Sequence, residues 1–173
     1  MALLIDKIEI ANHRQISTSV RDDKINPYIE DAELLDLRKM LGKALYNDIS
    51  INPTKATNVE LLNGKTWQDD AGNSYQFVGL KKILSILAYA RYIKFGSFTD
   101  TGFGYVQKST QDSTPVPETS KRDNYTKERQ TANEYFQDVK EFLDYSSDLY
   151  PLWNAHCGKR HGFNNIRISK ITR

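Results

Sequence analysis

The stretch GLKKILSILAYARYIKF, residues 79–95, decides the fold of this chain. On a helix, its apolar side chains cover well over half of the circumference, and Lys81, Lys82 and Ser85 supply only a narrow polar strip. The apolar members are Leu80, Ile83, Leu84, Ile86, Leu87, Ala88, Ala90, Ile93 and Phe95. Such a helix must be enclosed on most sides, either by the rest of the chain or by further copies of it. The pattern therefore predicts a buried central helix and bears on assembly as well as on fold.

Two further long helices are expected beside it. Asn26 suits an N-cap and Pro27 the first helical position, and apolar residues then recur at helical spacing as far as Ile49. Gly42 lowers the stability of the middle of this helix by about 1 kcal/mol relative to alanine and indicates a close packing contact. The other helix is predicted over Arg122–Tyr145, with a single apolar seam.

Shorter elements fill the rest of the predicted domain. The runs 66–68 and 74–77 flank a glycine-containing turn, which is typical of a β-hairpin. A short helix or turn is expected around Asn58–Leu62, and short extended pieces are expected within residues 1–25. Together these elements predict a mainly α fold: a small helical bundle with a short β-hairpin, a long loop and an extended C-terminal arm.

The long loop is predicted over Gly96–Ser120, which is rich in glycine, proline and polar residues. About 25 residues without a regular pattern are unusual inside a compact domain and are typically functional or disordered. Phe98, Phe103, Tyr105 and Val106 are apolar residues that a purely solvated linker would lack. We therefore expect these four to bind a partner.

The C-terminal tail differs in charge from the rest of the chain, and we divide the chain into a helical domain (1–153) and a basic tail (154–173). Five of the 24 Lys and Arg residues follow Asp148, the last acidic residue, and the remaining 19 are outnumbered by 22 Asp and Glu. The segment 166–171 also alternates between isoleucine and polar residues, as in a strand or an extended arm. We expect it to dock on another polypeptide. The predicted contact residues are Ile166, Arg167, Ile168, Lys170 and Ile171.

Composition excludes several classes of protein. No segment has the 18 or more uncharged apolar residues of a membrane span, and the first ten residues do not resemble a signal peptide. A single cysteine, Cys157, excludes an internal disulfide and fits a reducing compartment. We therefore expect a protein of the cytoplasm, or one assembled there, with no membrane partner.

Catalytic signals are sparse. His156, Cys157 and His161 form the only cluster that resembles a site, and they lack the second ligand pair usual for zinc. Paired aspartates lie in predicted turns, where aspartate bonds the local backbone. The sequence thus predicts no enzyme, no cofactor and no metal site, and a zinc assay would test the alternative.

Arg91 falls inside the apolar arc of the central helix. A guanidinium there must find a carboxylate or extend to solvent. We expect an ion pair with Glu134, Asp138 or Glu141 of the last long helix.

The order and spacing of several short motifs across residues 8–153 resemble a known family. The motifs are Asn26-Pro27-Tyr28-Ile29, Ala32, Leu35, Leu41, Gly42, Tyr46, Leu61-Leu62-Asn63-Gly64, Gly79-Leu80-Lys81, Ala88-Tyr89-Ala90-Arg91-Tyr92, Thr99, Thr101, Gly102 and Tyr150-Pro151-Leu152-Trp153. They resemble the head–tail connector proteins (portal adaptors, or neck rings) of tailed bacteriophages, most of all those of phages of Bacteroides-type hosts, including crAss-like phages.

The resemblance implies a structural virion protein at the head–tail junction, assembled in the host cytoplasm. Many copies would form a ring beneath the portal protein, continue the channel for genomic DNA, which passes without specific contacts, and receive the next neck or tail protein. Family members carry no active site. The alternative that the residues leave open is a small nucleic-acid-binding protein that uses the basic tail, although the tail lacks the aromatic interleaving of a stacking platform.

Overall fold

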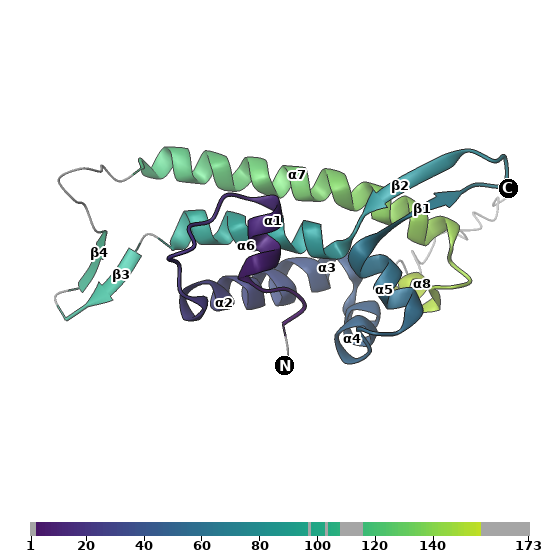
Figure 1. Cartoon of the computed structure of the whole chain (residues 1–173), viewed down its shortest axis with the longest axis horizontal. Coiled ribbons are helices and arrows are strands. Elements are labelled where there is room, and N and C mark those ends of the chain that lie inside the picture. The colour runs from purple at the N-terminus through teal and green to yellow at the C-terminus, as the bar shows by residue number, and fades with distance from the viewer. Residues whose placement is uncertain (1–2, 97, 103, 108–115, 157–173) are drawn as a thin grey trace, which may run out of the picture.

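The computed structural model describes residues 3–96, 98–102, 104–107 and 116–156. It is mainly helical, with two antiparallel hairpins (Figure 1). The elements are α1 (Lys7–His13), α2 (Asp22–Asp31), the π-helix η1 (Ala32–Leu37), α3 (Arg38–Leu41), α4 (Lys43–Ile51), α5 (Ala56–Asn63), β1 (Gly64–Gln68), β2 (Ser74–Val78), α6 (Leu80–Phe95), β3 (Phe98–Thr101), β4 (Gly104–Gln107), α7 (Glu118–Tyr145) and α8 (Pro151–His156).

Helix α6 is the centre of the bundle, as its sequence predicts. It packs against α1, α2, η1, α5 and α7, and Figure 1 shows it lying lengthwise beneath α7. Seven of its apolar side chains are buried: Leu80, Ile83, Leu84, Ile86, Leu87, Ala88 and Ala90. Ser85, which we placed on the polar strip, is buried as well, and its hydroxyl donates to the carbonyl of Lys81. One chain therefore encloses most of α6, and the helix gives no evidence for assembly.

The N-terminal region is helical, so the expected extended pieces are wrong for residues 7–13. Asp6 caps α1 by accepting a hydrogen bond from the Glu9 amide at 2.9 Å, and Ile10 is fully buried. The capping residue, with a glutamate three positions later, was the signal that the sequence offered for a helix start.

The single helix expected over residues 26–49 is instead a succession of segments. Its first helical residue is Asp22, five positions before the expected Pro27, because Asp22 and Asp23 complement the positive end of the helix. Pro27 consequently lies inside α2 and not at its first position. Gly42 separates α3 from α4, since its φ of 79° and ψ of 156° are incompatible with either helix.

The first hairpin confirms the prediction from the sequence. Strands β1 and β2 pair antiparallel with Trp67 opposite Tyr75. Gly79 then lets the chain pass close to the end of α5, because an added Cβ would collide with the Leu62 carbonyl oxygen and lie 2.7 Å from the Asn63 Cα. Hairpin and buried helix are thus joined by a contact that only glycine permits.

The segment predicted as one long loop contains a second hairpin. Strands β3 and β4 pair antiparallel across Gly102, and α7 begins at Glu118, four residues earlier than expected. The β-forming residues of both strands outweigh the glycines that suggested a loop. Figure 1 shows this hairpin projecting beyond the end of α6 and α7, at the opposite end of the molecule from β1 and β2.

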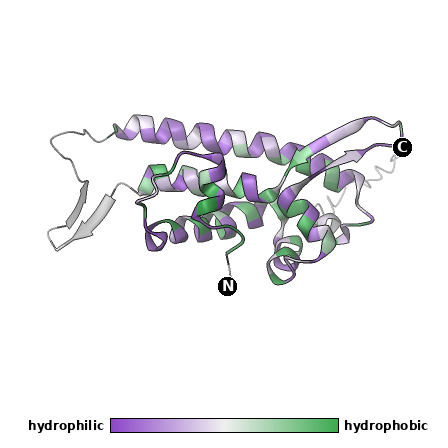
Figure 2. Cartoon of the chain, viewed as in Figure 1, coloured by the Kyte–Doolittle hydropathy of each residue, from purple (hydrophilic) through white to green (hydrophobic). Residues whose placement is uncertain are grey.

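Helix α7 covers α6 with one apolar seam, as expected. Its buried apolar residues are Ala132, Phe136, Val139, Phe142 and Leu143, and Figure 2 shows the rest of the helix as largely hydrophilic. After α7, Tyr150 and Trp153 are buried and pack against the core of the bundle. The Tyr150 hydroxyl donates to the Thr57 carbonyl at 3.1 Å, and the Trp153 indole donates to Asp144 at 2.6 Å. Helix α8 runs three residues past the domain limit that we set at 153.

Candidate functional site

Arg91 is in a buried ion pair, but with a partner other than those we expected. Its Nε donates to Asp36 Oδ2 at 2.7 Å, and the side chains of Arg91 and Asp36 are 12% and 5% exposed. Asp31 lies at the limit of an ion pair, 4.0 Å from Arg91 Nη1. The expected partners on α7 are wrong because Glu134, Asp138 and Glu141 lie on the exposed face of that helix.

Asp36 joins three elements of the bundle. While Oδ2 accepts from Arg91 on α6, Oδ1 accepts from Arg129 Nη1 on α7, also at 2.7 Å. Burial disfavours the charged form of Arg129, but the hydrogen bond to Asp36 and its negative charge raise the pKa of the guanidinium. The Tyr125 ring lies 5.3 Å from Arg129 Cζ and 4.3 Å from Lys94 Nζ, so it contacts two cations. This network fixes η1 to both long helices.

Asp36 was not predicted as the partner of Arg91, because only acids of the last long helix were considered. In η1 the Arg38 amide donates to the carbonyl of Glu33, five residues back, which shifts every following side chain around the axis. Glu33 and Asp36 precede that shift in the helix and are buried on the same side as Ile29 and Ala32, at ordinary helical spacing. Two features of the sequence could have indicated this ion pair. Asp36 interrupts the apolar run Leu34–Leu37, and Arg91 lies within the apolar arc of α6.

Three of the four predicted partner-binding residues of the loop lie in the second hairpin. Phe98 is the first residue of β3, and Tyr105 and Val106 are in β4. The register places Asp100 opposite Tyr105, and Thr99 opposite Val106. Phe103 lies outside the described residues.

A group of aromatic rings lies at the other end of the molecule and was not predicted. The Trp67 ring is stacked on Tyr75, with centroids 4.9 Å apart, and lies 4.7 Å from Tyr145 of α7. The Tyr75 hydroxyl donates to Asp69 at 3.2 Å, and the Tyr145 hydroxyl donates to Asp70 at 2.7 Å. We call Trp67, Tyr75 and Tyr145, with the carboxylates around them, the Trp67 patch. Sequence alone pairs Trp67 with Tyr75 across the hairpin, but not with Tyr145, 78 positions away.

Comparison with known proteins gives a family but no function. Residues 37–162 match the model of a family of unknown function, DUF6712. This chain is a member of the DUF6712 family. No curated protein and no solved structure matches it. The matched range includes α6, α7, both hairpins and the Trp67 patch, and it begins one residue after Asp36.

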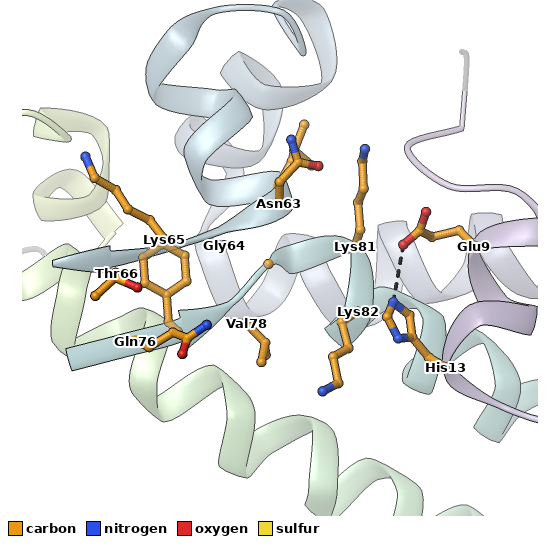
Figure 3. A pocket seen from close by; sticks show the side chains of 13 residues that line it. Glu9, His13, Asn63, Gly64, Lys65, Thr66, Gln76, Val78, Lys81 and Lys82 are labelled. Carbon is orange, nitrogen blue, oxygen red and sulfur yellow. Dashed lines mark hydrogen bonds and ion pairs between the residues drawn. The ribbon is translucent and has the colours of Figure 1, made fainter.

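One surface groove of this DUF6712 protein also carries positive charge. It has a volume of about 440 Å³ and lies between α1, the base of the first hairpin and the start of α6. Figure 3 shows its three lysines, Lys65, Lys81 and Lys82, pointing in different directions. Lys65 is paired with Glu60 at 2.9 Å, and Lys82 lies 4.5 Å from the centre of the Tyr135 ring. The charges do not converge on one position, so the groove is not arranged as an anion site.

Across the described part of this DUF6712 chain, no cluster of His, Cys, Asp and Glu could hold a metal ion. Within the same residues, none of the helices combines the length and the apolar character of a membrane span. Cys157 and His161, two members of the weak cluster noted from the sequence, lie outside the described residues. So do the predicted arm contacts: Ile166, Arg167, Ile168, Lys170 and Ile171.

Proposed function

We propose that this protein is a structural subunit of the head–tail junction of a tailed bacteriophage. Copies of it would form a ring beneath the portal, continue the DNA channel and dock the next neck or tail protein. The ordered motifs across residues 8–153 support this proposal through their resemblance to connector proteins.

The observation that carries the proposal is the hairpin of β3 and β4. It extends past the end of the bundle, and Figure 1 shows no helix covering it. A hairpin of two short strands is marginally stable in water when nothing packs against it. Both outer edges of this two-stranded sheet also lack a neighbouring strand among the described residues. A second protein surface would complete it.

This geometry suits a ring. A projection at one end of a subunit that contacts a different surface of the next copy makes a heterologous interface, and such interfaces close into rings when the rotation permits. The rod formed by α6 and α7 supplies a rigid base for the projection. The portal, the next neck or tail protein and the passing DNA are the remaining proposed partners, in the virion.

Electron microscopy of the purified protein with its portal tests the proposal. We expect rings on the portal for the wild-type chain, and none for a variant in which residues 98–107 are replaced by a glycine–serine linker of equal length. A variant with Lys127→Ala and Lys140→Ala, two exposed lysines of α7, is the matched control and should form rings. A wild-type chain that never binds the portal and is missing from virions would contradict the proposal.

The salt dependence of DNA binding distinguishes the alternative function, a nucleic-acid-binding protein, from a connector. If the basic tail binds nucleic acid, the isolated chain should bind DNA with an affinity that falls steeply as salt rises. If the protein is a connector, we expect it to bind DNA only weakly and without sequence specificity.

A further inference from the structure

The Trp67 patch presents aromatic faces to solvent in a fixed orientation. Tyr75 and Tyr145 are 42% and 45% exposed, yet each ring is packed against Trp67 and each hydroxyl is bonded to a carboxylate of the hairpin turn. Asp69 is itself held by the amides of Ala71 and Asn73, at 3.0 and 2.8 Å. Rings that are exposed but immobilised lose little side-chain entropy when a ligand binds.

The charge around these rings is negative. Asp69 and Asp70 lie in the turn, and the negative charge of Glu141 reaches Tyr75, whose pKa is raised by the hydrogen bond and charge of Asp69 and also by Glu141. Among the described residues, none of these three carboxylates has an ion-pair partner within 4.0 Å. Aromatic faces bordered by carboxylates attract cations, because the ring quadrupole and the carboxylate charge act in the same direction. The patch therefore fits a segment rich in Lys and Arg.

This chain itself carries such a segment. Residues 157–173 contain five Lys and Arg and no acidic residue. The segment follows α8, whose Trp153 donates to Asp144, the residue next to Tyr145 of the patch. The described chain therefore ends in a helix that packs against α7, which carries Tyr145 of the patch.

The length of the tail favours the patch of another copy. Arg167, Lys170 and Arg173 follow His156 by 11 to 17 positions, which corresponds to about 35–55 Å of extended chain. A site that adjoins the start of the tail would need only a few residues to be reached. We propose that the cations of residues 159–173 dock on the Trp67 patch of a second copy of this chain.

This inference deepens the proposed function, on which it rests, by naming one contact between neighbouring subunits. In this contact the tail is positively charged and the Trp67 patch is negatively charged. Association of the subunits should therefore strengthen as the salt concentration is lowered. Charge reversal on each side provides the test in the full-length chain.

The experiment uses two variants and a control, and measures self-association by analytical ultracentrifugation at low salt. The patch variant is Asp70→Lys with Glu141→Lys, and the tail variant is Arg167→Glu with Lys170→Glu. We expect each alone to weaken self-association by about tenfold or more. An equimolar mixture of the two should restore it, because the reversed patch then meets the reversed tail. The control, Lys39→Glu with Lys43→Glu, reverses two exposed lysines of α3 and α4 and should associate like the wild type.

Three results would overturn the inference: a wild-type chain that stays monomeric at low salt, a tail variant that associates like the wild type, or a mixture that fails to associate. The last result would mean that the tail docks on its own chain or elsewhere. If the substitutions in the patch lower the Tm so far that the patch variant unfolds, the tail variant alone still tests the proposal. Virion incorporation separates the two proposals: a tail variant found in necks as often as the wild type contradicts only the docking, whereas a wild-type chain absent from virions contradicts only the connector function.

Discussion

Arg91 and Asp36, 55 positions apart in the chain, form the polar centre of the bundle. The 2.7 Å hydrogen bond from Arg91 Nε to Asp36 Oδ2 is almost wholly removed from solvent. Because Arg129 bonds the other oxygen of Asp36, one carboxylate accepts hydrogen bonds from two guanidinium groups and connects η1, α6 and α7. A buried charge that loses its partner is costly, so this contact restricts how the three elements can pack.

Arg91→Ala should lower the stability of the protein substantially. Removing one side of a buried pair costs about 3–5 kcal/mol, and the remaining Arg129 keeps the loss near the lower value. At about 2–4 °C per kcal/mol for a chain of this size, we expect the Tm to fall by roughly 6 °C or more. Thermal unfolding followed by circular dichroism measures it. Glu134→Ala and Asp138→Ala, which remove exposed acids of α7, are the controls and should each change the Tm by about 1 °C or less.

Asp36→Ala should cost more than Arg91→Ala. It leaves two buried or half-buried guanidinium groups without their shared anion, whereas Arg91→Ala leaves Asp36 with one partner. A double-mutant cycle between the two positions should show a coupling energy of about 0.5–3 kcal/mol in denaturant unfolding. Additive effects would mean that the two side chains contribute independently, contrary to the geometry.

How far the sequence predicts this protein depends on the kind of signal. Periodicity located α6 and α7 correctly, because burial of Ile83, Leu84 and Leu143 is a property of one helix face. The start at Asp22 was misread, because Pro27 is so strong a sign of a first turn that the acidic residues before it received too little weight. The partner of Arg91 was missed for a different reason: Asp36 lies 55 positions away in the chain, and no local pattern shows which helix carries the acid that faces Arg91. To predict the Trp67 patch, one would have to know that Tyr145 contacts the hairpin. That contact depends on how α7 packs and is not visible in the sequence.

Glu33 should make stability depend on pH in the direction opposite to most carboxylates. Burial raises its pKa above the ordinary value of 4.5, although the Leu4 amide, which donates to Oε1 at 2.7 Å, opposes the shift. The folded state therefore binds this proton more tightly than the unfolded state, and the contribution of Glu33 to stability falls as pH rises from about 4.5 through the folded pKa. Glu33→Gln mimics the protonated form and removes this dependence.

The measurement for Glu33 is urea unfolding of the wild type and Glu33→Gln across the acidic range. We expect the variant to gain stability relative to the wild type as pH rises toward neutrality. Glu134→Gln, which changes an exposed glutamate of α7, is the control and should show no such trend. A difference between wild type and Glu33→Gln that does not vary with pH would show that the carboxyl titrates alike in both states.

The segment from Gly96 to Ser120 should change its susceptibility to proteases on assembly. In the free subunit the hairpin of β3 and β4 projects from the bundle, so brief digestion should cut near it before it cuts α6 or α7. In the proposed ring, the neighbouring subunit should protect it. Mass spectrometry of the first fragments compares the two states, with the exposed turn at residues 52–55 as an internal reference. Equal cutting in both states would mean that the hairpin is not part of the interface.

Deletion of residues 157–173 should separate folding from assembly. The buried Tyr150 and Trp153 that close the bundle lie before the cut, and α8 ends at His156, so the shortened chain keeps every contact described for the core. Because no contact described for the core is lost, we expect the Tm to stay within about 2 °C of the wild type. Incorporation into the neck should be lost, because Ile166–Ile171 and the five cations that we expect to contact another polypeptide are gone. A deletion that unfolds the domain would place the tail in its own core, and a deletion that still assembles would leave the arm without a role in the ring.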